Sequence, residues 1–561
     1  MSVFTRGILG AAASSQRGLT TGTVAEPVRM SWRDVHEQAK RMAGGLATKG
    51  VGRHGSVAML ASEAADVAPL AQAVWLSRAA LTMLQCPTPR ADLAVWLDDT
   101  LRAIRLVDAD AVVVGEPFSK VLDQLAGHGV TVCTVESLRE AEPIELGAED
   151  DAAETDIALR QLTSGSTGVP KAVEIRHGNI AAHAVGLWHA FRLDVDADVM
   201  VTWLPLSHDM GMIAFLCFPM QLGVDTVVVT PEQFLRRPLS WVELISRHRG
   251  TITSGPNFGY SILARHLPRA NPAEIDLSCL RIAVNGAEPI DHRDVADFTA
   301  AAARFGLRPS AVMPAYGLAE ATLAVTLSAA DERAIVDTVS RQAVADAHRA
   351  QPVATNSADA QHVVCVGHPL TGMEVLIARD GKALAPRQIG AIKVRGPAIA
   401  DSYLTAGGVV PLAGDDGWFD TGDLGYLDEQ GRLYVCGRTK DLIVLAGKNL
   451  YPHDIERAAE GVDGVRKGCV IALRVDAERE AFAVLAEVHT ANEKDVGVRI
   501  RRDITARVHR EIGHAPHEVR LFPAGTLPKT PSGKPRRNYA LELLSQSGRR
   551  PIGFHPVLAD P

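Results

Sequence analysis

Apolar positions along the chain follow two alternating patterns. In one pattern, apolar residues recur every third or fourth position, as on a helix face, and this is clearest at residues 32–46 and 65–79. Ser31 stands just before the first of these stretches, where a hydroxyl is a favoured N-cap. The other pattern consists of short apolar runs that predict buried strands, at residues 55–60, 111–115, 130–134, 157–162, 199–203, 226–229 and 281–284. Strands alternating with helices favour α/β architecture with parallel sheets.

The pattern changes beyond residue 323. Residues 331–360 are polar, with no strand pattern before residues 362–365, and such long irregular segments are more often functional or mobile than part of a core. Further strands are predicted at residues 374–377, 391–394 and within 423–435, then at 469–473 and 483–488, followed by a helix at 498–512. The junction at residues 436–441 therefore separates a main body from a smaller unit.

Composition limits the class of protein. A chain of 561 residues is too long for one hydrophobic core, and 47% hydrophobic with 22% charged residues is ordinary for a soluble globular protein. The net charge of −8 is spread without long runs, so there is no electrostatic case for a nucleic-acid partner. The seven cysteines stand singly, which indicates neither a zinc site nor a disulfide framework and favours a cytoplasmic location.

No transmembrane segment is predicted. The most apolar stretch, residues 212–229, is interrupted by Pro219, Gln221 and Asp225. This stretch is more typical of a buried helix followed by a strand.

The most informative motif is TSGSTGVPK, which follows the strand predicted at residues 157–162. Its glycines, Gly165 and Gly168, allow backbone N–H groups to point at an anion. Hydrogen-bond donors and a positive charge come from Thr163, Ser164, Ser166, Thr167 and Lys171. The motif therefore predicts a phosphate-binding loop, although a flexible Ser/Gly turn has similar composition.

Two familiar phosphate loops do not fit this motif. A P-loop requires Gly-Lys-Ser/Thr, but Gly168 is followed by Val-Pro-Lys, and the dinucleotide pattern G-x-G-x-x-G is also absent. Residues 172–175 alternate like a strand, so we expect strand, loop and strand here, with a helix beginning after Asn179.

Four other segments could complete a nucleotide site. Gly286 follows a strand and leaves room for a flat ring, Tyr316 offers an aromatic face, and Glu320 and Asp423 offer carboxylates. Lys534 lies in a basic loop near the C-terminus. Each residue alone is weak evidence, since Glu320 is typical of a solvated helix and Asp423 of a turn. Together they supply what a nucleoside triphosphate with Mg²⁺ requires.

In this order, the motifs resemble those of the acyl-adenylate-forming superfamily of acyl-CoA synthetases, nonribosomal-peptide adenylation domains and luciferases. The resemblance runs from about residue 31 to residue 544. Residues 203–211, 254–258 and 316–322 resemble the fatty acyl-AMP ligases more than ordinary CoA ligases. In the magnesium motif Ala319 replaces the usual threonine, which also resembles that subgroup, and Pro531 and Pro535 stiffen the lysine loop.

The resemblance implies a large N-terminal domain of two α/β sheet subdomains plus a β-barrel-like subdomain, and a small mobile α+β C-terminal domain. We expect the N-terminal core at residues 1–436 and the small domain at 437–561. The irregular segment, at about residues 323–366, resembles the insertion of the fatty acyl-AMP ligases.

The implied activity is ATP-dependent activation of a fatty acid to acyl-AMP with release of pyrophosphate. The acyl group then passes to the phosphopantetheine thiol of an acyl carrier protein or of a polyketide or nonribosomal-peptide synthase module. One alternative is an acyl-CoA ligase, which is favoured if no inserted segment packs against the small domain. A second is a non-catalytic acyl- or nucleotide-binding subunit, which would need no catalytic lysine.

The resemblance also implies residue roles. Lys534 and Glu320 would be catalytic, with Glu320 binding Mg²⁺, and Lys440 or its neighbour Asp441 would be the hinge. The fatty-acid pocket would include His208, Asp209 and Asn257. ATP would be bound by Thr163, Ser164, Gly165, Ser166, Thr167, Gly168, Lys171, Gly286, Ala287, Glu288, Tyr316, Gly317, Asp423 and Arg438.

Overall fold

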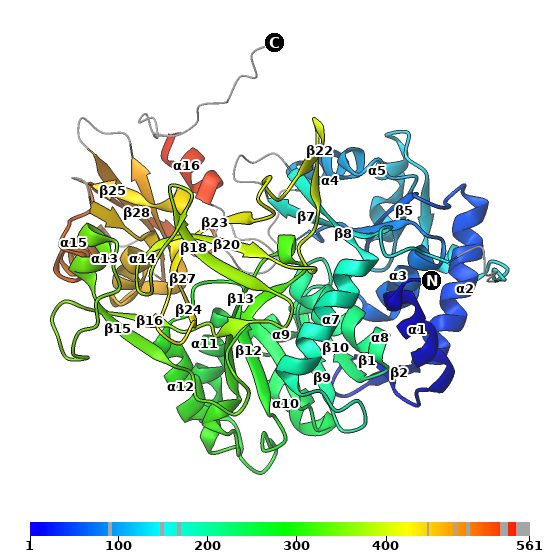
Figure 1. Ribbon diagram of the computed structural model, residues 1–561, viewed down its shortest axis with the longest axis horizontal. Coiled ribbons are helices and arrows are strands. Elements are labelled where there is room, and N and C mark those ends of the chain that lie inside the picture. Colours follow the sequence, from blue (N-terminus) through cyan, green and yellow to red (C-terminus); the bar gives the residue numbers. More distant parts are fainter. Residues whose placement is uncertain are drawn as a thin grey trace.

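The fold comes from a computed structural model (Figure 1), which describes residues 1–87, 93–145, 151–164, 170–445, 448–475, 480–489, 494–527 and 537–545. The predicted α/β architecture is confirmed: the main body contains two large sheets with helices packed on them.

The first large sheet has eight strands in the order β22-β21-β8-β7-β4-β3-β5-β6. Strands β3, β4, β5, β6 and β7 are parallel, whereas β8, β21 and β22 join antiparallel at one edge. Their bounds are β3 (Ser56–Leu60), β4 (Ala80–Met83), β5 (Ala111–Val114), β6 (Val132–Thr134), β7 (Ile157–Ser164), β8 (Pro170–Arg176), β21 (Ser402–Thr405) and β22 (Gly408–Pro411).

The second large sheet has nine strands in the order β17-β14-β13-β12-β11-β9-β10-β1-β2. In this order, the neighbouring strands from β13 through β12, β11, β9 and β10 to β1 are parallel. At one side of the sheet β14 and β17 join antiparallel, and at the other side β2 does. Their bounds are β1 (Gly18–Gly22), β2 (Pro27–Ser31), β9 (Val199–Thr202), β10 (Asp225–Val228), β11 (Ile252–Pro256), β12 (Ile282–Gly286), β13 (Val312–Gly317), β14 (Ala324–Leu327) and β17 (His368–Pro369).

Helices cover both sheets. They are α1 (Val3–Ser14), α2 (Trp32–Thr48), α3 (Ala64–Leu76), α4 (Leu93–Leu106), α5 (Leu122–Ala126), α6 (Val135–Arg139), α7 (His177–Phe191), α8 (Phe218–Leu222), α9 (Pro231–Arg236), α10 (Ser240–His248), α11 (Asn257–His266) and α12 (His292–Ala303). The predicted N-cap of α2 is confirmed, since Ser31 and Asp34 form a capping box. A core cluster with Trp32, Trp75 and Trp203 fills the space between the layers.

Two helix predictions need correction. Helix α7 begins at His177, before Asn179, because the side-chain Oδ1 of Asn179 accepts the Arg176 N–H at 2.9 Å and so caps the first turn. The apolar stretch at residues 212–229 is a helix followed by a strand, as predicted, but it begins within a π-helix, Met210–Cys217. None of the helices in the described ranges has the length and apolar character needed to cross a membrane.

A five-stranded antiparallel sheet follows, in the order β19-β18-β20-β23-β24. Its strands are β18 (Glu374–Arg379), β19 (Lys382–Ala383), β20 (Gly390–Arg395), β23 (Phe419–Leu427) and β24 (Leu433–Arg438). Against it packs a unit that we call the β15–β16 segment: β15 (Val336–Ser340), α13 (Arg341–Ala347) and β16 (Ala360–Val364).

The sequence-based prediction of no strand before residues 362–365 is wrong, because β15 pairs antiparallel with β16. The polar composition of β15 does not produce the apolar pattern from which a strand is predicted. Only Val339 of this strand is fully buried, where it packs in a cluster with Tyr426 and Tyr434. That packing depends on contacts distant in sequence, which a local pattern does not record.

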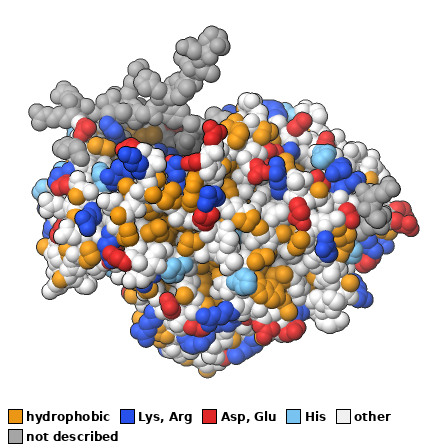
Figure 2. Space-filling model, viewed as in Figure 1, with side chains coloured by type: hydrophobic (Ala, Val, Ile, Leu, Met, Phe, Trp, Pro, Cys, Tyr) orange, Lys and Arg blue, Asp and Glu red, His pale blue; other side chains and the backbone are white. Residues whose placement is uncertain are grey.

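The C-terminal unit has its own hydrophobic core, which includes Ile455, Phe482 and Ile504. Its elements are β25 (Ile443–Leu445), β26 (Lys448–Leu450), α14 (Pro452–Glu460), β27 (Val465–Val475), β28 (Ala481–Val488), α15 (Lys494–Ile512), β29 (Glu518–Pro523) and α16 (Arg537–Ser545). In Figure 1 this unit, in orange and red, lies at one end of the molecule. Acidic and basic side chains are intermixed over the face seen in Figure 2.

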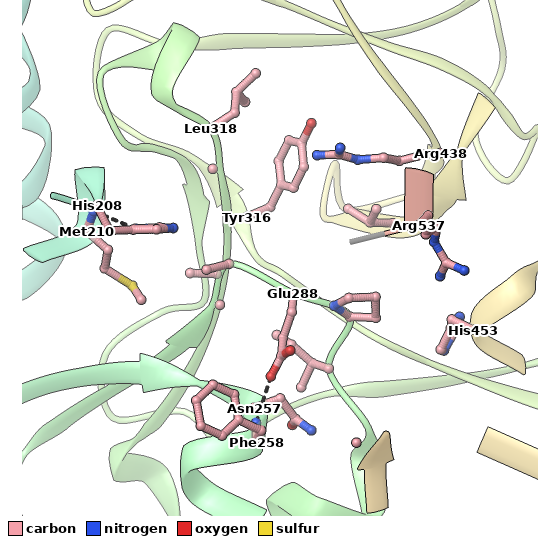
Figure 3. A pocket seen from close by; sticks show the side chains of 18 of the residues that line it. His208, Met210, Asn257, Phe258, Glu288, Tyr316, Leu318, Arg438, His453 and Arg537 are labelled. Carbon is pink, nitrogen blue, oxygen red and sulfur yellow. Dashed lines mark hydrogen bonds between the residues drawn. The ribbon is translucent and has the colours of Figure 1, made fainter. Parts of the chain in front are cut away.

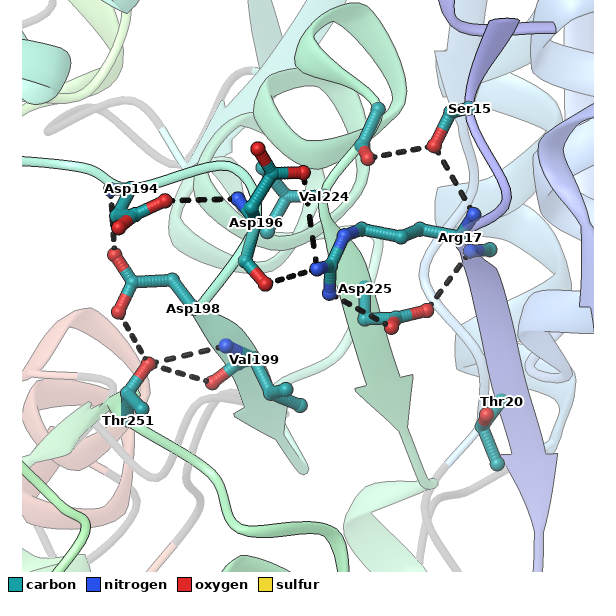
Figure 4. A network of polar contacts seen from close by, with 12 residues as sticks. Ser15, Arg17, Thr20, Asp194, Asp196, Asp198, Val199, Val224, Asp225 and Thr251 are labelled. Carbon is teal, nitrogen blue, oxygen red and sulfur yellow. Dashed lines mark hydrogen bonds and ion pairs between the residues drawn. The ribbon is translucent and has the colours of Figure 1, made fainter.

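A buried polar network holds the nine-stranded sheet at the edge where its parallel strands begin (Figure 4). Asp198 is 2% exposed and accepts hydrogen bonds from Thr251 Oγ1 at 2.7 Å and from Arg281 Nε at 2.9 Å. Burial alone would raise the pKa of Asp198, but the bonds from Arg281 and Thr251 outweigh it and lower that pKa. The network therefore joins the starts of β9, β11 and β12 through one buried carboxylate.

Asp198→Ala should lower the free energy of unfolding by about 3 kcal/mol, because it leaves the Arg281 guanidinium without its partner. Chemical denaturation measures this loss. As a control, Glu374→Ala removes an ion pair with Arg395 in which the two side chains are 57% and 45% exposed, and should cost much less, because exposed ion pairs contribute little to stability. Equal losses in the two variants would contradict the assignment.

The contribution of Asp198 to the free energy of unfolding should also depend on pH. Because the folded-state pKa is depressed, the stabilisation is present above the unfolded-state pKa and disappears as the pH falls through the folded-state pKa. The difference between wild type and Asp198→Ala should therefore shrink in acid.

Candidate active site

The predicted site residues meet at the opposite edge of the nine-stranded sheet, where its parallel strands end. Loops at this edge of a parallel sheet commonly carry ligand sites. His208, Asn257, Glu288 and Tyr316 follow or end β9, β11, β12 and β13 respectively, and all four line one cavity of ≈ 2700 Å³. In Figure 3, His208 lies on one side of Tyr316, with Arg438, His453 and Arg537 on the other.

A buried carboxylate forms one end of the site. Asp423, 6% exposed, accepts a hydrogen bond from Tyr316 Oη at 2.7 Å and pairs with Arg438 Nε at 3.2 Å. Residues 423 and 438 are cross-strand partners of β23 and β24. Burial raises the pKa of Asp423, and the charge of Arg438 opposes that rise. An ionised carboxylate held in this way can accept hydrogen bonds from ligand hydroxyls.

The backbone beside this carboxylate is tightly constrained. A Cβ added to Gly317 would lie 2.0 Å from the Leu323 carbonyl oxygen, so only glycine fits there. A Cβ at Gly286 would lie 3.1 Å from the Ala315 carbonyl oxygen, so close strand packing is a second reason for that glycine besides room for a ring. Ala287 has a φ of 68°, an unusual conformation for a residue with a side chain.

Glu288 lies in the same wall, but its carboxylate is directed to a helix end. Its Oε1 accepts the Phe258 N–H at 2.7 Å, at the N-terminus of α11 (Figure 3). Asn257 is similarly engaged, since its Nδ2 donates to Asp294 Oδ2 at 2.7 Å and its Oδ1 accepts from Asn285 at 3.2 Å. These two side chains therefore hold the wall of the cavity together.

The phosphate-loop motif lies between two antiparallel strands, as predicted. Thr163 and Ser164 at the end of β7 pair with Lys171 and Pro170 at the start of β8. Thr163 and Lys171 line the cavity, and Thr163 Oγ1 donates to the Lys171 carbonyl oxygen at 3.4 Å. Gly165, Ser166, Thr167 and Gly168 lie outside the described residues.

Lys171 and Glu320 meet in the cavity although they are far apart in sequence. Lys171 Nζ lies 3.7 Å from Glu320 Oε1, and the Glu320 side chain is 14% exposed. Burial lowers the pKa of Lys171, and Glu320 opposes that change. Tyr403, which the sequence did not single out, contacts both residues.

His208 and Asp209 directly precede the π-helix, with Asp209 as its N-cap, and they pair with each other: His208 Nδ1 lies 2.6 Å from Asp209 Oδ1. Asp209 also accepts the Met210 N–H at 2.7 Å. Apolar side chains extend this part of the cavity, namely Leu187, Phe191, Met210, Phe215 and Leu327. Charged groups therefore lie next to an apolar volume, as a fatty acid requires.

The C-terminal unit closes the other side of the cavity. Arg438, Lys440 and Asp441 lie at the junction and line the cavity. Arg537 reaches back to this junction: its Nη1 lies 2.5 Å from Glu456 Oε1 and its Nε lies 3.6 Å from Asp441 Oδ2. The predicted catalytic residue Lys534 lies outside the described residues, three positions before this anchored arginine in the sequence.

The β15–β16 segment also packs against the C-terminal unit. Gln361 Nε2 donates to Asp454 Oδ2 at 2.9 Å, and Asp346 Oδ1 lies 3.6 Å from Lys448 Nζ. A third polar contact joins His348 Nδ1 and Asn449 Nδ2 at 3.2 Å. Three elements of the C-terminal unit are thus connected to this segment, since Arg341 also donates to the Glu511 carbonyl oxygen on α15.

Sequence reasoning did not identify Tyr403 and Arg537 as site residues. Tyr403 sits in a short strand of unremarkable composition, and its place depends on how β21 pairs with β8. Arg537 was visible only as part of a basic run, and its partners on β27 and α14 are distant in sequence.

Comparisons with known proteins agree with the geometry. A family model described as AMP-binding enzyme matches residues 11–404. A protein named putative ligase Rv1013, from Mycobacterium tuberculosis, is 46% identical over 97% of this chain and 100% of its own length. The medium-chain-fatty-acid–[acyl-carrier-protein] ligase JamA of Moorena producens is 35% identical, covering 68% of this chain and 67% of its own.

A solved structure from a study of fatty acyl-adenylate ligases of E. coli and L. pneumophila has the same fold. It superposes with a TM-score of 0.89 and 28% sequence identity, covering 98% of each chain.

Proposed function

The chain belongs to the AMP-binding enzyme family of the acyl-adenylate-forming superfamily, and on this premise we propose that it is a fatty acyl-AMP ligase. It activates a fatty acid with ATP to acyl-AMP, releasing pyrophosphate, and passes the acyl group to the phosphopantetheine thiol of a carrier protein. The observation that carries the proposal is the meeting of Lys171, Glu320, Tyr316 and Asp423 in one cavity beside an apolar volume.

The nucleoside would bind at the Tyr316 end of the cavity. Adenine would stack on the Tyr316 ring against the backbone of Gly286, Ala287 and Gly317, and Asp423 would accept hydrogen bonds from the ribose hydroxyls. Arg438 stabilises the ionised form of Asp423, which is the better acceptor.

The phosphates would bind at the Lys171 end. Lys171 supplies positive charge, and hydroxyls and backbone N–H groups of the motif at residues 163–168 supply donors. Glu320 fits a role in holding Mg²⁺: it is an oxygen ligand at the cavity wall, and its side-chain contacts with Tyr403 and Lys171 both involve Oε1. When bound, Mg²⁺ would neutralise phosphate charge.

In the first half-reaction, a carboxylate oxygen of the fatty acid bonds to the α-phosphorus and the bond to pyrophosphate breaks. His208 and Asp209 would border the acid's carboxylate. Lys534 would stabilise the negative charge that develops around the phosphorus. In the second, the thiol sulfur bonds to the acyl carbon, AMP leaves, and the thiol proton is released.

We propose the division of the chain at residues 436 and 437, with Lys440 as the hinge about which the small domain rotates between half-reactions. Arg537 would fix one end of the Lys534 loop to this unit through Glu456. The seven cysteines, all within the described ranges, are free, which supports a cytoplasmic location.

A carrier-protein thiol is the proposed acceptor in place of CoA. Support comes from the packing of the β15–β16 segment, part of the insertion-like stretch at residues 323–366, against the C-terminal unit. Such contacts would restrict the small-domain rotation that the second half-reaction requires, and a carrier protein that binds the enzyme surface could offset this cost.

The purified protein, incubated with a fatty acid, ATP and Mg²⁺, should accumulate acyl-AMP and release pyrophosphate. Adding CoA should yield no acyl-CoA, whereas adding a phosphopantetheinylated carrier protein should consume the acyl-AMP. Mass spectrometry follows both products. Robust acyl-CoA formation would instead identify an acyl-CoA ligase, and absence of acyl-AMP with every acid would support a non-catalytic subunit.

Lys534→Ala should lower the adenylation rate by ~10²–10³, because it removes one preorganised charge from the reacting phosphorus. ATP should still bind, since the other contacts remain. Lys382→Ala, at an exposed position on β19, is a matched control that should keep the wild-type rate. An unchanged rate in Lys534→Ala would show that another group stabilises the transition state.

A further inference from the structure

Tyr403 lies beside the phosphate end of the cavity because of how two strands pair. In the antiparallel pair of β21 and β8, Tyr403 is opposite Val173. Lys171 is two positions from Val173 on the same strand, so Lys171 and Tyr403 are diagonal neighbours on the same face of the sheet. Diagonal neighbours are within reach of an aromatic and a long side chain.

The side chains of Tyr403, Lys171 and Glu320 form a closed triangle. Lys171 Nζ lies 3.4 Å from the centroid of the Tyr403 ring, a cation–π contact. Tyr403 Oη donates a hydrogen bond to Glu320 Oε1 at 2.5 Å, and the same oxygen lies 3.7 Å from Lys171 Nζ. One tyrosine therefore contacts both the residue proposed to bind phosphate and the residue proposed to bind Mg²⁺.

The backbone of Glu320 is held separately. The Ala400 N–H donates to the Glu320 carbonyl oxygen at 2.8 Å, and Thr322 Oγ1 donates to the Ala398 carbonyl oxygen at 2.7 Å. Thr322 is fully buried with a φ of 63°, a strained conformation for a β-branched residue that these contacts maintain. With the main chain fixed in this way, the Tyr403 hydroxyl determines how the Glu320 carboxylate is oriented.

We propose that Tyr403 is a positioning residue of the adenylation site. Its hydroxyl holds the Glu320 carboxylate in the orientation that receives Mg²⁺, and its ring face holds the Lys171 ammonium toward the phosphates. The proposal rests on the proposed function only in taking ATP with Mg²⁺ as the ligand. Loss of the hydroxyl should weaken metal-dependent binding of ATP, and loss of the ring should also weaken metal-independent binding.

The test uses Tyr403→Phe, which keeps the ring, and Tyr403→Leu, which removes both features. Tyr434→Phe is a matched control, because the Tyr434 hydroxyl also bonds to a carboxylate, Asp428 at 3.1 Å, and Tyr434 lies in the five-stranded sheet. Isothermal titration calorimetry measures ATP affinity over a series of Mg²⁺ concentrations and in EDTA. Thermal melting of each variant reports folding.

For Tyr403→Phe, the Mg²⁺ concentration for half-maximal ATP affinity should rise about tenfold, since a hydrogen bond to a charged group is lost. Its ATP affinity in EDTA should match wild type. Tyr403→Leu should lose affinity under both conditions, and Tyr434→Phe under neither. An unchanged Mg²⁺ dependence in Tyr403→Phe, with or without a lower melting temperature, would overturn the positioning role.

The binding assay needs no fatty acid, so it separates the two proposals. If the protein binds ATP with Mg²⁺ but forms no acyl-AMP, the proposed function fails and the result for Tyr403 stands. If ATP binding by wild type does not depend on Mg²⁺, the role of Tyr403 fails irrespective of the reaction catalysed.

Discussion

The rest of the site depends on one buried carboxylate, that of Asp423. Asp423 is only 6% exposed, and burying a charged group costs free energy unless the group is paired and hydrogen-bonded. Tyr316 provides the hydrogen bond and Arg438 provides the opposite charge. Tyr316 lies near the end of a strand of the nine-stranded sheet, Asp423 belongs to the five-stranded sheet, and Arg438 lies at the junction with the C-terminal unit. Keeping this carboxylate paired therefore requires three parts of the molecule to meet at one point.

In the nine-stranded sheet, the groups that stabilise the fold and the groups that could bind a ligand lie at opposite edges. At the edge where the parallel strands begin, Asp198 bonds to internal partners and is not among the residues that line the candidate site's cavity. At the edge where they end, Asp423, Glu320 and Lys171 line the cavity and contact only a few neighbours. The same physical rule, that a buried charge needs a partner, thus stabilises the fold at one edge and leaves ligand-binding groups at the other.

The sequence predicted much of the fold because its local signals agree with the final packing. The alternation of helices and strands, the Ser31 cap and the strands on either side of the phosphate-loop motif are all confirmed. The strand β15 escaped prediction because one buried valine gives no periodicity. Tyr403 and Arg537 escaped because their roles arise from contacts between segments distant in sequence, and composition contains no trace of such contacts.

The most direct test of the nucleotide site compares ATP with 2′,3′-dideoxy-ATP in wild type and in Tyr316→Phe, by calorimetry. If Asp423 accepts hydrogen bonds from the ribose hydroxyls, wild type should prefer ATP. Tyr316→Phe should lose about tenfold in ATP affinity, since the hydroxyl that holds Asp423 is gone. Its affinity for the dideoxy nucleotide should hardly change, because the ring remains for adenine. Equal losses for both nucleotides, or no preference in wild type, would contradict this assignment.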